Sequence, residues 1–205
     1  MRRVQILSLS PLLLLASCLL NPTETMPLKG ATPSSVMVLW PTNSSGRPIV
    51  DLVSLASGAD DAVRAREYRV LPLRVGFDLA SNHGLVAGQP LDRAALHQLS
   101  VATGIDAVLV IDVESWNVEG EPPQRASWGV TWSLLSTRGG AELWTYRDEG
   151  EWIRRQPPRL DPTRSFDEEP EVLPIGALRG EGFRTQAELV AALHRRAMQR
   201  LPELE

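Results

Sequence analysis

Residues 106–114 read DAVLVIDVE, and this stretch is the strongest strand signal in the chain. Its middle is apolar at every position, and it turns polar only at Asp112 and Glu114, where it ends. A strand that is apolar on both faces is typical of the centre of a sheet with helices on each side. The stretch therefore predicts the central strand of an α/β domain.

Strand and helix patterns alternate before this central strand, and strands follow it. Before it, the sequence predicts strands at 36–40 and 69–73, helices at 76–85 and 91–103, and a helix over 49–68 that is interrupted near Ser57 and Gly58. After it, alternating residues predict strands at 127–136 and 142–146, and a capping box of Thr185 and Glu188 begins a last helix. The order β-α-β-α-α-β-β-β-α predicts a single α/β domain whose mixed sheet is flanked by helices.

The start of the chain has the layout of a secretory signal. Two arginines precede an apolar run, and residues 15–18, which read LASC, close that run with the single cysteine of the chain. LASC resembles a lipobox, a bacterial motif in which the peptide is cut before a cysteine that carries diacylglycerol and an N-linked acyl chain such as palmitate. The resemblance implies cleavage between Ser17 and Cys18 and lipidation of Cys18. Leu19, in place of an aspartate, favours the outer membrane.

An uncleaved anchor helix over residues 4–20 is the alternative interpretation of the apolar run. Its length is just within the ~17–25 residues that span a bilayer, but its polar residues and its proline weaken it. We therefore favour a lipid anchor, which implies a domain held in the periplasm.

Composition divides the chain into five parts. Residues 19–35 are rich in Pro, Thr, Ser and Gly and have no apolar period, which is typical of a flexible tether. Residues 154–184 combine five prolines with dense mixed charge, which predicts disorder. The predicted parts are a signal peptide (1–17), a lipidated tether (18–35), an α/β core (36–153), a Pro-rich charged loop (154–184) and a C-terminal helix that packs on the core (185–202).

Charge and composition exclude several classes of function. The chain has 21 basic and 25 acidic residues, a net charge of −4, and loss of Arg2 and Arg3 with the signal would leave −6. Nucleic acid is therefore not an expected partner. Lys29 is the only lysine, which excludes a phosphate-loop lysine and a buried Schiff-base lysine in the domain.

No catalytic motif, metal site or cofactor other than the covalent lipid is expected. None of His83, His97 and His194 has another ligand at a metal-binding spacing. Asp112 and Glu114 have the spacing of a carboxylate pair on one strand face, but the solvated end of a strand is the favoured interpretation.

Tryptophans cluster on or beside the last three predicted strands. The favoured interpretation is core packing beneath the helices, since large apolar residues on one face of a sheet usually meet helices. If one of them is exposed, this part of the sheet is the expected partner surface. The residues concerned are Trp116, Trp128, Trp132 and Trp144.

Four segments resemble, in order and spacing, a family of outer-membrane lipoproteins typified by a neisserial vaccine-candidate antigen. They are VMVLWPTNSSG (36–46), EYRVLP (67–72), TGIDAVLVIDV (103–113) and LLSTRGGAELW (134–144). The resemblance implies a fold like that of the TolB amino-terminal domain and of the curli-secretion lipoprotein CsgG. It implies no reaction, because the family has none established. The chain departs from the family pattern between residues 154 and 184.

These observations predict an outer-membrane lipoprotein that is not an enzyme and that binds a protein partner in an envelope transport or secretion assembly. Self-association stays open. One alternative, suggested by fold similarity alone, is an activator lipoprotein of a peptidoglycan synthase. Another is an envelope glycan hydrolase that uses Asp112 and Glu114.

Overall fold

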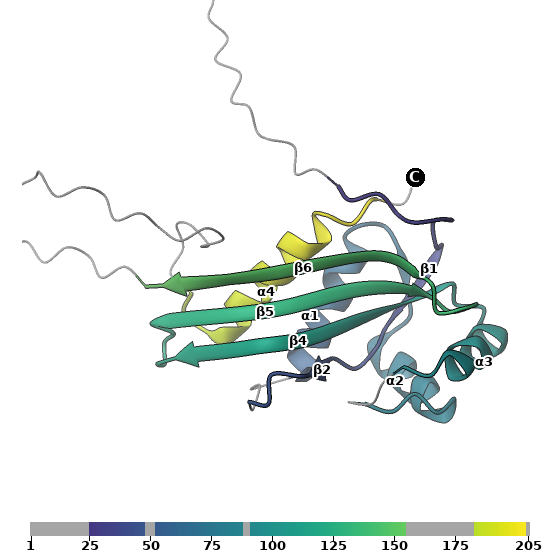
Figure 1. Ribbon diagram of the computed structural model, residues 1–205, viewed down its shortest axis with the longest axis horizontal. Helices are drawn as coiled ribbons and strands as arrows, with labels where there is room; N and C mark the ends of the chain where they lie inside the picture. The colour runs from purple at the N-terminus through teal and green to yellow at the C-terminus, as the bar shows by residue number, and fades with distance from the viewer. Residues whose placement is uncertain (1–24, 48–51, 88–90, 155–182, 204–205) are drawn as a thin grey trace, which may run out of the picture.

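The computed structural model describes residues 25–47, 52–87, 91–154 and 183–203. The predicted signal peptide (1–17), Cys18 and almost all of the predicted loop (154–184) lie outside these residues. The described part is a mixed α/β domain, as predicted, with four helices and six strands, of which the short β2 was not predicted (Figure 1). The strands are β1 (Ser35–Val38), β2 (Thr42–Asn43), β3 (Arg69–Val70), β4 (Ala107–Glu119), β5 (Arg125–Ser136) and β6 (Glu142–Ile153). The helices are α1 (Leu52–Arg64), α2 (Leu73–Asn82), α3 (Arg93–Thr103) and α4 (Gln186–Met198).

The strands form one mixed sheet in the order β3-β1-β4-β5-β6. Strand β1 pairs in parallel with β3 and β4, and β2 pairs in parallel with β4 further along. The last three strands form an antiparallel meander. Strand β4 is therefore central, as its apolar run predicts, and β6 is the last strand on one side.

Strands β4 and β6 are longer than the sequence patterns predict. Strand β4 continues past Glu114 as far as Glu119, which pairs with Arg125 of β5. Strand β6 continues past Tyr146 to Ile153. The buried residues of these extensions are Trp116 in β4 and Asp148 and Trp152 in β6, because the described helices cover one face of this part of the sheet.

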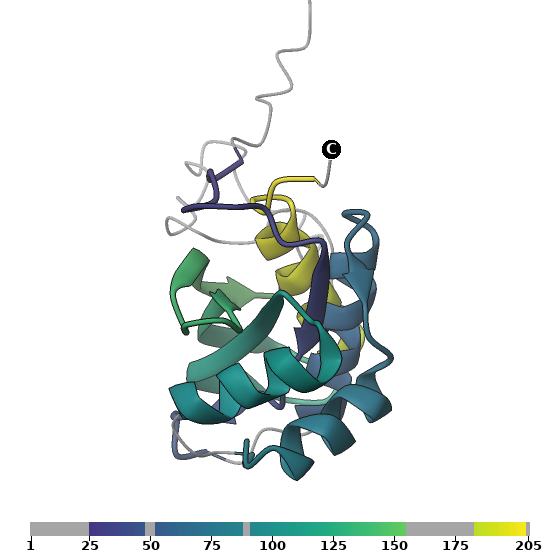
Figure 2. The ribbon, with the colours of Figure 1, turned by 90° about the vertical axis from the view of Figure 1, so that its right-hand side faces the viewer.

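Two apolar clusters lie on the two faces of the sheet. The larger joins α1 and α4 to one face of all three long strands, with Val36, Leu109 and Trp128 at its centre. The smaller joins α3 to Met37 and Val108 on the opposite face. Helices α2 and α3 gather at one end of the long strands, and α1 and α4 lie behind them (Figures 1 and 2). The far half of the second face has no described helix over it.

Helix α1 is continuous, so the predicted interruption at Ser57 and Gly58 is wrong. Gly58 faces α4, where a Cβ atom would lie 2.8 Å from Cδ2 of His194. This glycine therefore serves close packing of two helices and does not end a helix. By contrast, Gly104 ends α3 in the left-handed conformation, as predicted.

The segment 25–34 lies against the domain, so the prediction of a flexible tether up to residue 35 is wrong for these residues. The Met26 N–H donates to the Arg200 carbonyl at 2.8 Å, and the Lys29 N–H donates to the Leu143 carbonyl at 2.7 Å. Lys29 Nζ also lies 2.7 Å from Oε1 of Glu142. Two long-range backbone contacts thus fix this segment to the end of α4 and to β6.

Helix α4 begins at the predicted capping box. The Glu188 N–H donates to Oγ1 of Thr185 at 3.2 Å, and Oε2 of Glu188 accepts from the Arg184 N–H at 2.6 Å. In the usual capping box the glutamate side chain accepts from the N–H of the capping residue itself. Here it accepts from the N–H of Arg184, one residue before Thr185. The predicted start of the helix is confirmed.

Candidate functional site

The four tryptophans proposed as a conditional partner surface are buried, with exposed fractions between 0 and 6%. The expectation of a partner surface there is corrected, because an indole inside the folded chain cannot contact a partner. The alternative, core packing beneath helices, is what the structure has. Two of these indoles also make polar contacts beneath α4.

These polar contacts connect β5 and β6 to α4. Trp128 Nε1 donates to Oδ1 of Asp148 at 3.1 Å, and Nε of Arg196 lies 3.2 Å from Oδ2 of the same carboxylate. Asp148 is only 2% exposed, so its charge is compensated by α4 and not by water. Trp132 Nε1 donates to Nδ1 of His194 at 3.1 Å. Helix α4 is therefore held by a hydrogen bond to β5 and an ion pair to β6 as well as by apolar contact.

His194 is a buried, neutral histidine. Because Nδ1 accepts from Trp132, the proton of the neutral ring is on Nε2, which has no hydrogen-bond partner among the described residues. Burial lowers the pKa of His194 to about 4, and a weaker interaction with the backbone of Leu55 opposes that shift. Its role is structural. His83 is half-buried and His97 is exposed, and no cluster of potential metal ligands occurs among the described residues.

The two carboxylates of the predicted pair have separate protein partners. Oδ1 of Asp112 accepts from the hydroxyls of Thr42 and Ser44, each at 2.8 Å. Glu114 accepts from the Thr131 hydroxyl at 2.7 Å and forms an ion pair with Arg147, also at 2.7 Å. Asp112 therefore fixes β2 to β4, while Glu114 links β4 to β5 and β6.

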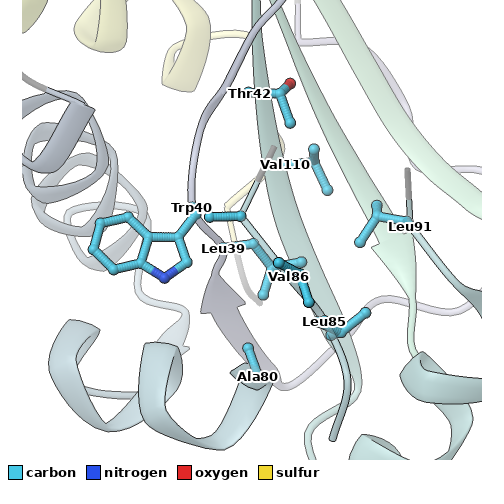
Figure 3. Close-up of a pocket in the computed structure, with 9 residues that line it drawn as sticks. Leu39, Trp40, Thr42, Ala80, Leu85, Val86, Leu91 and Val110 are labelled. Atoms are coloured by element: carbon cyan, nitrogen blue, oxygen red, sulfur yellow. The ribbon is translucent and has the colours of Figure 1, made fainter. Parts of the chain in front are cut away.

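An apolar notch opens beside Asp112, where β1 ends and β2 begins. Leu39, just after β1, and Val110 of β4 line one side, and Leu85 and Leu91, which lie between α2 and α3, line the other (Figure 3). Its cavity volume is about 30 Å³, which is room for roughly one water molecule, whereas organic ligands occupy ~300–1,000 Å³. The notch can therefore seat the tip of a side chain but cannot enclose a substrate.

The surface that sequence reasoning missed is the face of β6 without a described helix, together with its outer edge in the described sheet. The residues concerned are Thr145, Arg147, Glu149, Glu151 and Ile153. The sequence pattern ended this strand at Tyr146, before these charged residues. The alternation of Trp144, Tyr146 and Trp152 with polar residues was the signal that could have extended the strand.

Comparison with known proteins identifies the family. The family model of GNA1162-like lipoproteins matches residues 24–152. This chain belongs to that family. The match confirms the resemblance seen in the four segments, and it ends before α4.

The solved structures similar to this GNA1162-like chain include lipoproteins and oligomers. The crystal structure of lipoprotein GNA1162 from Neisseria meningitidis is 23% identical and covers 60% of this chain and 81% of that chain, with a TM-score of 0.47. A PelC dodecamer from Paraburkholderia phytofirmans is 16% identical over 84% of this chain and 89% of that chain, with a TM-score of 0.49. The LpoB C-terminal domain from Escherichia coli is 16% identical over 58% and 84%, with a TM-score of 0.44. No curated protein sequence matches this GNA1162-like chain.

No helix among the described residues of this GNA1162-like chain is both long and apolar enough to cross a membrane.

Proposed function

We propose that this chain is a lipid-anchored, non-enzymatic binding module of the outer membrane, with its domain in the periplasm, that serves an envelope transport or secretion assembly. The observation that carries the proposal is membership of a lipoprotein family from residue 24 onward. The matched region begins six residues after Cys18, and Cys18 directly follows the predicted signal peptide.

The link between anchor and domain is short. Only eight peptide units separate Cys18 from Met26, whose N–H is bonded to the Arg200 carbonyl of the domain. Eight residues span at most about 29 Å when fully extended. The anchor would therefore hold the carboxyl end of α4 near the membrane surface. This reach supports a partner in or close to the same membrane, and it disfavours the alternative of an activator that works at a distance.

The chemistry of the described surface supports binding in preference to catalysis. Asp112 and Glu114 are each bonded to partners that stabilise the ionised carboxylate: two hydroxyls for Asp112, and a hydroxyl and a guanidinium for Glu114. Both carboxylates are therefore engaged in contacts that join strands of the sheet. The nearby notch is too small for a sugar ring.

Replacing Cys18 by serine is expected to abolish lipid attachment. A hydroxyl is not the thiol that receives diacylglycerol in a lipobox, so incorporation of a labelled fatty acid into the full chain should fall to background. Two or three acyl chains hold a protein on a membrane durably, which a single chain does not. The measurement is metabolic labelling with an alkyne fatty acid, combined with the intact mass of the mature chain.

Ser10→Ala is the matched control, since it changes a hydroxyl in the same signal and should leave labelling unchanged. A label that persists in Cys18→Ser, or a wild-type chain that retains Met1, would contradict the lipid anchor and favour an uncleaved helix.

A further inference from the structure

We infer that residues 25–33 form a releasable strap, which gives the lipid anchor a short reach while the strap is docked on the domain and a longer reach once it is released. The longer reach rests on the proposed lipid anchor, whereas the release of the strap does not. The inference is carried by a contrast between the contacts along the strap and those at its inner end, Ser34.

The outer part of the strap is docked by contacts that are open to water. Its backbone donates two hydrogen bonds, from Met26 and Lys29, to carbonyls at the end of α4 and in β6 (Figure 1). The side chains of the ion pair between Lys29 and Glu142 are 68% and 41% exposed. Leu28 packs on the core but is only half-buried. A hydrogen bond of this kind adds modest net stability, and an exposed ion pair adds little.

Conformational entropy opposes the docked strap. Nine residues are held along one path, and each loses backbone freedom. Segments with few buried apolar contacts and exposed backbone hydrogen bonds open at low free energy while the rest of a protein stays folded. The strap has these properties, since Leu28 is half-buried and the ion pair of Lys29 is exposed. We therefore expect it to open without unfolding of the sheet.

The inner end of the strap is fixed at Ser34. Oδ2 of Asp106 accepts from the N–H and the hydroxyl of Ser34, at 3.0 and 2.6 Å, and from the Ser35 hydroxyl at 3.2 Å. These bonds, that of the Ser34 hydroxyl first among them, lower the pKa of Asp106 below its usual value. Hydrogen bonds to an ionised carboxylate are stronger than those between neutral groups. Ser35 also begins β1, so release of the strap ends at Ser34.

The two states of the strap differ in reach. In the docked state, the eight peptide units between Cys18 and Met26 span at most about 29 Å. Release back to Ser34 leaves sixteen peptide units, 34 minus 18, which span at most about 58 Å. The docked state holds the end of α4 near the membrane, and release doubles the largest separation between anchor and domain.

Gly30 provides a variant that acts on the docked strap alone. Its φ is +107°, a value that favours glycine, and an added Cβ atom would meet nothing within 4 Å. Alanine therefore strains the docked backbone without a clash, while the released strap has no such constraint. Gly139→Ala is the matched control, because a Cβ atom there also meets nothing within 4 Å and its φ is not positive.

A protease that cuts only after lysine measures the release, because Lys29 is the only lysine of the chain. When release is faster than cleavage, the cleavage rate follows the population of the released strap. The full chain in detergent is compared with a synthetic peptide of residues 25–34, which is always free. We expect the chain to be cut about 10- to 1,000-fold more slowly than the peptide, and the fragment that begins at Gly30 to stay folded by circular dichroism.

Variants assign the protection to the docked strap. Relative to a peptide of the same sequence, Gly30→Ala should be cut at least about fivefold faster than wild type, and Glu142→Gln about twofold faster. Gly139→Ala should be cut at the wild-type rate. Glu149→Gln should be too, since it removes an ion-paired glutamate of β6 away from the strap.

Three results would overturn release of the strap. Cleavage less than about tenfold slower than that of the peptide would show that the strap is not docked. Cleavage more than about 1,000-fold slower, or only at urea concentrations that unfold the domain, would show that the strap opens only with the whole domain. Equal rates for Gly30→Ala and Gly139→Ala would show that the docked strap does not limit cleavage.

Energy transfer tests the longer reach. A fluorophore on Gln199→Cys, an exposed position at the end of α4, is paired with acceptor lipids in vesicles that carry the lipidated chain. Adding Gly30→Ala should lower the transfer efficiency, and unchanged transfer would overturn the longer reach. A chain that does not bind vesicles would instead refute the lipid anchor of the proposed function, and the cleavage rates would still decide whether the strap is released.

Discussion

Replacing Trp132 by alanine is expected to lower the free energy of unfolding by about 4 kcal/mol. The side chain is fully buried, and its removal leaves a cavity between β5 and α4. It also removes the Nε1–H that donates to Nδ1 of His194 at 3.1 Å, so a buried nitrogen loses its partner. Since domains of this size are stable by only about 5–15 kcal/mol, the loss is a large share of the total. Urea unfolding monitored by circular dichroism measures it.

Two variants separate packing from hydrogen bonding at this position. Trp132→Phe retains an aromatic ring and loses the donor, so it should cost about half as much as alanine. Val101→Ala removes an apolar side chain that is 76% exposed on α3, and it should change stability by less than about 0.5 kcal/mol. A Trp132→Ala variant as stable as Val101→Ala would show that α4 does not pack on β5 as described.

The free energy of unfolding is expected to decrease as the pH is lowered, because of His194. Its pKa is lowered from 6.5 to about 4 by burial, so the unfolded chain takes up a proton before the folded chain does. The contribution is complete above pH 6.5 and is lost as the pH falls from about 6.5 to 4, by ~3 kcal/mol in all. Protonation would also place a hydrogen on Nδ1, facing the indole donor of Trp132.

The measurement compares urea unfolding at pH 7 and pH 4.5 for wild type, His194→Gln and His97→Gln. Wild type and His97→Gln should lose stability in parallel. His194→Gln should lose about 2–3 kcal/mol less over the same range, because its side chain does not titrate. Equal losses in all three proteins would show that His194 is not held neutral in the core.

The centre of the fold could be predicted because its signals are local. The apolar run of β4 specifies a strand covered on both faces, and Thr185 with Glu188 specifies the start of α4. Gly104 likewise marks the end of α3. Each of these signals lies within a few residues of the feature it determines.

The length of β6 could not be predicted in the same way. Arg147, Asp148 and Glu149 are charged neighbours, which is typical of a loop. Asp148 is nonetheless buried, because Arg196 reaches it from a helix that is distant in the sequence. The polar layer beneath α4 depends on three elements that meet only in the folded chain, and no local pattern encodes that meeting.

The candidate surfaces also divide into one that local sequence patterns could predict and one that depends on residues far apart in the sequence. Tryptophans on one strand face could be assigned to the core from the sequence, and the structure agrees. The position of β6 at the edge of the described sheet could not be found without the strand order, since a sequence does not state which strand lies last. The contact of Met26 with Arg200 could not be predicted either, because the two residues are far apart in the sequence and meet only in the folded chain.

The most direct test of the account is crosslinking capture of the lipidated full chain from membranes, beside Cys18→Ser, with identification by mass spectrometry. The account predicts that subunits of an envelope transport or secretion assembly are captured with the lipidated chain and lost, or strongly reduced, with Cys18→Ser. Capture of a peptidoglycan synthase in place of such subunits would replace the proposed role with that of an activator. Absence of any stable protein partner would contradict the claim that this chain is a binding module.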